Sequence, residues 1–167
     1  MIALAAALLA AATSCNVPQD EVELQGALTY EMFDSRDGPY GWRPLNAAGC
    51  TDAALRLLAA YATMNDARLS LEQRLELRFH SGQVLAFSGR EGEAIPYFVQ
   101  ANSPRATAEW QAYVAATVAF LKHDAPALAA AREAYATIAP GSMRLRIVDG
   151  FVACPHESYS KAVHCKM

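Results

Sequence analysis

The sequence of 167 residues predicts a single all-α domain. Alanine is used heavily, and glycine and proline are scattered singly, a composition that favours helices over a β-sandwich. From Thr51 to Ile138, apolar residues recur at intervals of three and four, which is the period of one helix face. The chain is also long enough to bury most of its apolar surface without a partner.

Residues 1–14 (MIALAAALLAAATS) contain no charged side chain and are too short to span a bilayer. Their length is typical of the apolar region of a secretory signal peptide, which we expect here. The small residues before Cys15 resemble a bacterial lipobox, although Ala12 stands where leucine is usual. This resemblance implies a lipid on Cys15 and membrane attachment through it. An ordinary secretory signal and a buried N-terminal helix are the alternatives.

Residues 15–39 are expected to form a linker with one short helix between Gln19 and Phe33, before a turn-rich stretch at 34–41. A short helix over 42–48 should end at Gly49. Thr51 can cap the next helix, over 51–64, whose apolar face is Ala54, Leu55, Leu58, Tyr61 and Ala62.

Ser70 is the predicted cap of a long helix over 70–88, and Gly89 begins the turn to a partner helix over 91–102. Pro96 removes one backbone hydrogen bond in that partner, so we expect a bend there and no break. Further helices are predicted over 107–122, 124–139 and 143–153, with one or two more turns over 157–166.

Small residues recur in GQVLAFSGREGEAIPYFVQA (82–101) where two helices would touch, and a large apolar residue fills the gap between them. The pattern of Gly82, Gly89, Ala94, Phe98 and Ala101 resembles a tetratricopeptide repeat. Half of it recurs 40 residues earlier, where the family's spacing is 34, in a set made up of Gly49, Ala54, Leu58 and Tyr61. The resemblance implies three stacked antiparallel helix pairs over 40–140 in a right-handed array, with a helical cap over 141–167.

The expected pairing of the four cysteines depends on the cellular compartment. In an oxidising compartment, Cys154 and Cys165 are the natural pair, because only eleven residues of sequence separate them. Closing a loop of this length would stabilise the fold by roughly 2–3 kcal/mol. With a lipid on Cys15, Cys50 would be a free, buried thiol, although pairing with either C-terminal cysteine stays open.

The main catalytic signatures are missing from the sequence, so we expect no enzyme. Ser158-Tyr-Ser-Lys161 fits the S-x-x-K motif of penicillin-recognising enzymes, but that family's other motifs are missing. A zinc site built from Cys154, His156, His164 and Cys165 is the metal-binding alternative, although a disulfide is favoured and no cofactor is expected. His80 and His123 are expected at the surface or at helix ends. A net charge of −3 without a Lys/Arg run argues against nucleic acid.

The family resemblance implies a groove, lined by the first helix of each pair, that binds a protein or peptide. Candidate partner-binding residues on the solvent faces are Arg74, Arg78, Gln111 and Lys122. Most aromatic residues fall on apolar faces and are expected in the core, whereas Trp42 and Tyr40 are less constrained and free to be exposed. We therefore expect a non-catalytic binding scaffold of the bacterial cell envelope. The alternatives are a metal-binding envelope protein and a cytosolic interaction module.

Overall fold

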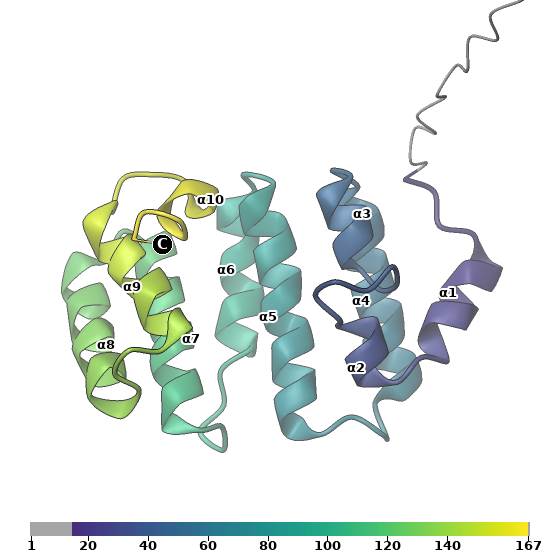
Figure 1. Cartoon of the computed structure of the whole chain (residues 1–167), viewed down its shortest axis with the longest axis horizontal. Helices are drawn as coiled ribbons and strands as arrows, with labels where there is room; N and C mark the ends of the chain where they lie inside the picture. The colour runs from purple at the N-terminus through teal and green to yellow at the C-terminus, as the bar shows by residue number, and fades with distance from the viewer. Residues whose placement is uncertain (1–14, 167) are drawn as a thin grey trace, which may run out of the picture.

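A computed structural model describes residues 15–166. Within this range the chain is helical and contains no strand, which confirms the all-α prediction. The helices stand side by side in one row, from α1 at one end to α8 and α9 at the other (Figure 1). Their bounds are α1 Gln19–Gly26, α2 Tyr30–Phe33, α3 Arg43–Ala47, α4 Thr51–Asn65, α5 Leu71–Phe87, α6 Glu91–Gln100, α7 Ala108–Leu121, α8 Ala125–Ile138, α9 Met143–Ala153 and α10 Tyr159–Ala162.

The long helices begin at the caps that the sequence predicts. The Ser70 hydroxyl accepts from the Gln73 amide at 3.1 Å, and the Gln73 side chain accepts from the Ser70 amide at 2.9 Å, which completes a capping box. Thr107 and Asp124 cap α7 and α8 in the simpler way. Gly89 adopts a φ of +81°, a left-handed conformation that glycine allows at the turn between α5 and α6.

The helices pack in pairs, α5 on α6 and α7 on α8, as the sequence predicts. Gly82 explains the close contact in the first pair, because a Cβ there would lie 3.0 Å from the Phe98 ring. Phe98 is fully buried, and its ring lies 4.7 Å from that of Phe79 and 6.0 Å from that of Tyr159. The small residue therefore makes room for the large one.

The N-terminal region differs from the prediction. The single helix expected between Gln19 and Phe33 is two helices, α1 and α2, separated by a turn at 27–29. The α1 helix packs on α4, where the Asn65 amide donates to the Gly26 carbonyl at 3.0 Å. The short α3 also packs on α4, so α4 contacts α1, α3 and α5.

Trp42 is buried, with 3% of its surface exposed, whereas Tyr40 is 44% exposed. The residues around Trp42 form no apolar stripe, so the sequence did not predict that Trp42 is buried. It joins an N-terminal core cluster that contains Phe33 and Tyr61, whose rings stack at 3.7 Å.

Two disulfides connect the four cysteines. Cys154 pairs with Cys165, as predicted. The expectation of a free Cys50 is wrong, because Cys50 is bonded to Cys15. The same bond conflicts with a lipid on Cys15, since a sulfur in a disulfide cannot also form a thioether. The disulfides indicate an oxidising environment.

The predicted signal peptide at residues 1–14 lies outside the described residues. From Cys15 to Lys166, no helix has both the length and the apolar character needed to cross a membrane.

The C-terminal segment folds back onto the middle of the row. The α9 helix packs on α7 and α8, and α10 packs on α9 and α5 (Figure 1). Gly150 permits this contact, because a Cβ there would collide with the carbonyl oxygen of Ala162. The fully buried Tyr159 and the Cys154–Cys165 bond fasten the segment.

Candidate functional site

A groove of about 500 Å³ runs between α3, α5, α7 and α9. Its walls combine aromatic, apolar and charged side chains, which reach it from four helices and the loop before α3. The lining residues are Arg36, Trp42, Arg43, Asn46, Glu76, Phe79, His80, Gln83, Phe87, Trp110, Tyr113, Met143, Arg144 and Ile147.

Asp34 does not line the groove, but it holds three side chains at the α3 end of the groove. Its Oδ1 accepts from Trp42 Nε1 at 2.8 Å and from Arg43 Nη2 at 3.1 Å, and lies 3.0 Å from His80 Nδ1. Burial alone would raise the pKa of Asp34, but His80, the Trp42 indole and the Arg43 guanidinium outweigh it and lower that pKa. One ionised carboxylate therefore holds side chains from α3 and α5 in place.

His80 is largely buried, with 14% of its side chain exposed, so the expectation of a surface or helix-end imidazole is wrong for this residue. Its ring lies 5.0 Å from that of Trp42. The contact between His80 Nδ1 and Asp34 is close but is not aligned as a hydrogen bond.

Arg144 of α9 reaches across to α5 and α7. Its guanidinium lies 3.8 Å from both Glu76 and Glu109. The same group is positioned over the rings of Trp110 and Tyr113, at 5.3 and 5.5 Å from their centroids. Arg144 is thus held between two carboxylates and two aromatic rings.

Glu76 is fixed from its other side by the Tyr30 hydroxyl, which donates to its Oε2 at 2.7 Å. Burial first, and then the negative charges of Asp34 and Glu76, raise the pKa of Tyr30, so its hydroxyl keeps its proton. The polar groups along the α5 wall are therefore already oriented without a ligand.

The four predicted partner-binding residues do not line the groove. Arg74 donates to the Asp66 carbonyl at 2.7 Å, Arg78 to the Gln100 carbonyl at 3.3 Å and Gln111 to the Ala106 carbonyl at 2.8 Å. Lys122 is exposed at the end of α7. These contacts tie loops and the end of α6 to α5 and α7, and the structure does not gather the four residues into one site.

Sequence reasoning missed the face of α5 that does line the groove, although its periodicity is visible. Glu76, Phe79, His80, Gln83 and Phe87 follow one another at intervals of three, one, three and four residues. Because this face mixes charged, polar and aromatic residues, it does not form the apolar stripe by which a buried face is recognised.

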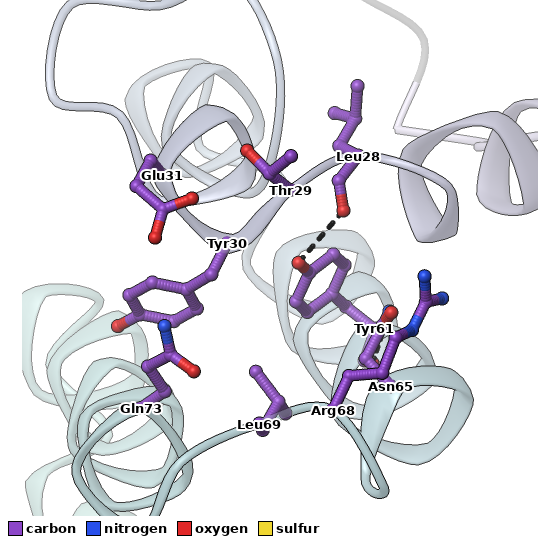
Figure 2. Close-up of a pocket in the computed structure, with 9 residues that line it drawn as sticks. All are labelled: Leu28, Thr29, Tyr30, Glu31, Tyr61, Asn65, Arg68, Leu69 and Gln73. Carbon is purple, nitrogen blue, oxygen red and sulfur yellow. Dashed lines mark hydrogen bonds between the residues drawn. The ribbon is translucent and has the colours of Figure 1, made fainter.

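A second hollow, of about 280 Å³, lies between the turn after α1, the end of α4 and the start of α5 (Figure 2). The Tyr61 hydroxyl donates to the Leu28 carbonyl across it at 3.0 Å. Burial is the main cause that raises the pKa of Tyr61. Asn65 bonds to the backbone at the end of α1, so Tyr61 and Asn65 both hold the chain in place here.

The other sequence candidates are separated or occupied. Ser158 Oγ lies 3.1 Å from Ser160 Oγ, while Lys161 Nζ lies 3.1 Å from the Glu157 carboxylate, so the S-x-x-K serine and lysine each contact another residue. The disulfide consumes both thiols of the proposed zinc site. Over residues 15–166, no group of three His, Cys, Asp or Glu side chains is placed to hold a metal. His123 lies at a helix end, with a φ of +54°.

Comparisons with protein-family models, with curated proteins and with solved structures find no match for this chain.

Proposed function

We propose that this chain is a non-catalytic, tetratricopeptide-like scaffold that binds a segment of a partner protein in the groove between α3, α5, α7 and α9. The observation that carries the proposal is the groove itself, which alternate helices of the row build together. Its volume falls within the roughly 300–1,000 Å³ that is usual for ligand sites.

The chemistry of the walls supports binding of a polypeptide. Phe87 on α5 and Met143 on α9 are large apolar side chains that remain 38% and 51% exposed. Polar groups that could bond to a peptide backbone or to side chains lie beside them, among them Asn46 and Gln83. Since helices carry these groups, little conformational entropy would be lost on binding.

The proposed compartment is the bacterial periplasm. Two disulfides in one small domain are typical of proteins that fold in an oxidising environment. Intact mass of the natively produced chain tests this, after alkylation without reduction. We expect a chain with no alkylated thiol, whereas four alkylated cysteines would place the protein in a reducing compartment.

The binding proposal is tested by selecting peptides from a random library displayed on phage, with the full oxidised chain as bait. Asn46→Trp places a large side chain inside the groove at a residue whose side chain makes no hydrogen bond. Ala130→Trp makes the same change on the exposed side of α8, outside the groove. Circular dichroism verifies that both variants are folded.

We expect the selected peptides to bind the wild type and Ala130→Trp equally well. Asn46→Trp should weaken binding by about tenfold or more, the loss expected when a central contact of an interface is removed. Failure to enrich any peptide, or peptides that bind Asn46→Trp as well as the wild type, would refute the proposal.

A further inference from the structure

The α3 end of the groove offers hydrogen-bond donors that the protein itself leaves unused. Across the part of the chain that the structure describes, the side chains of Arg36 and Asn46 make no hydrogen bond or ion pair. Arg43 uses Nε and Nη2 on Asp34, which leaves Nη1 unbonded. Three side chains with unused nitrogens therefore line this end of the groove.

Acceptors are scarce at the same place. Asp34 lies behind the wall, and its Oδ1 already serves Trp42, Arg43 and His80. Among the described residues, Glu76 is the one carboxylate that lines the groove, and the Tyr30 hydroxyl donates to its Oε2. A ligand that offers oxygen acceptors would satisfy groups that are now unpaired, whereas a cationic ligand would meet guanidinium groups.

The arginines do not contribute equally. Arg144 lies between Glu76 and Glu109, and Arg43 is paired with Asp34, so nearby carboxylates compensate both charges. Arg36 is exposed and has no such partner. Of the described arginines that line the groove, Arg36 is therefore the one whose charge no carboxylate compensates.

Apolar side chains line the groove on α9 and α5. Met143 and Ile147 lie one turn apart on α9, and Phe87 lines the α5 wall. Trp110 and Tyr113 of α7 contribute aromatic surface and are themselves buried. A large apolar side chain placed here would cover surface that is now exposed to water, which is favourable.

We propose that the partner segment in this groove is acidic and carries a large apolar side chain. Its carboxylates would contact Arg36 and Asn46 at the α3 end, and its apolar side chain would pack on Met143 and Ile147 of α9. This inference rests on the proposed function and adds the chemistry of the partner. Arginine suits the role because its planar guanidinium binds a carboxylate through two parallel hydrogen bonds.

The net charge of the whole chain, −3, does not favour an acidic partner. Selectivity must therefore come from contacts inside the groove, since salt screens charges that lie more than about 10 Å apart at ordinary ionic strength. The decisive comparison is between peptides that differ only in the charge of their polar residues.

The test uses three fluorescein-labelled mixtures of short peptides. They share Leu and Phe at alternate positions, and the remaining positions are Glu in the first mixture, Gln in the second and Lys in the third. Fluorescence anisotropy with the full oxidised chain measures affinity. We expect the Glu mixture to bind about tenfold more tightly than the Lys mixture, and this difference to shrink as salt is raised.

Arg36→Gln removes the uncompensated charge, and we expect it to weaken binding of the Glu mixture about fivefold or more while leaving the Gln mixture unchanged. Arg78→Gln is the matched control, because Arg78 is an exposed arginine of α5 outside the groove. Equal affinity for the three mixtures, or no effect of Arg36→Gln, would overturn the inference.

The outcomes separate this inference from the proposed function. Library peptides that depend on Asn46 but show no excess of acidic residues, and that bind Arg36→Gln normally, would leave the binding groove standing and refute the acidic partner. The absence of any peptide that depends on the groove would refute both. Binding of decanoate with no binding of the Glu mixture would assign the groove to a fatty acid and also overturn the inference.

Discussion

A single methyl group at Gly150 tests how the C-terminal segment is packed. In α9, a Cβ at this position would collide with the carbonyl oxygen of Ala162 in α10. The obstacle is backbone and cannot rotate away, so α9 and α10 would have to separate. Because Tyr159 and the Cys154–Cys165 bond fasten α10, any separation would disturb both.

Two opposing effects decide the size of the change in Gly150→Ala. Alanine is better than glycine in a helix interior by about 1 kcal/mol. Overpacking of a well-packed contact costs about 1–3 kcal/mol, and a backbone obstacle favours the upper part of that range. We therefore expect the free energy of unfolding to fall by roughly 1–2 kcal/mol, and Tm by about 2–8 °C for a chain of this size.

Gly92→Ala is the matched control. No atom lies within 4 Å of a Cβ at Gly92 in α6, so only the helix preference acts and stability should rise by about 0.5–1 kcal/mol. Thermal and urea unfolding of the oxidised proteins measures both variants. If Gly150→Ala were as stable as Gly92→Ala, the close contact between α9 and α10 would be refuted.

Two further predictions concern the disulfides and Asp34. Replacing Cys15 and Cys50 by serine should lower the free energy of unfolding by about 4 kcal/mol, and replacing Cys154 and Cys165 should lower it by about 3 kcal/mol. The two values differ because crosslinks over 35 and 11 residues remove different amounts of entropy from the unfolded chain. Urea unfolding that gives the reverse order would contradict this prediction. Asp34→Asn should cost roughly 2 kcal/mol near neutral pH, because it weakens charge-assisted hydrogen bonds. Since folding lowers the pKa of Asp34, the stability that its carboxylate supplies is present above the ordinary value of 3.8 and is lost as pH falls through the lower folded-state pKa. Unfolding measured against pH should show the wild type approaching Asp34→Asn there, and a gap that stays constant would be the contrary result.

Helical periodicity predicted much of the fold because it is a local property. The capping residue Ser70, the turn at Gly89 and the apolar faces on either side place α5 and α6 within two residues of their observed ends. The close contact between Gly82 and Phe98 was also predictable, because the sequence puts a small residue in one helix where a large residue of the next helix would touch it.

The contacts that were missed join residues far apart in the chain. Cys15 pairs with Cys50 because α1 returns the N-terminal segment to α4, and no local pattern describes that return. Trp42 and His80 are largely buried around Asp34, a residue within a turn-rich stretch that resembles a solvated loop in sequence. The groove was missed for the same reason, because each helix contributes only a few of its lining residues.

The core consists of two clusters that meet in α5. Leu77 and Val84 of α5 belong to the cluster shared with α4, whereas Leu75, Phe79 and Leu85 belong to the cluster shared with α6–α10. From this division we expect two cooperative units, of which the N-terminal one opens while the other stays folded. The α3 wall of the groove belongs to the first unit, and its α7 and α9 walls belong to the second. A ligand bound in the groove would therefore couple the unfolding of the two units. It would slow amide hydrogen exchange in α3 and α4 without contacting most of either helix.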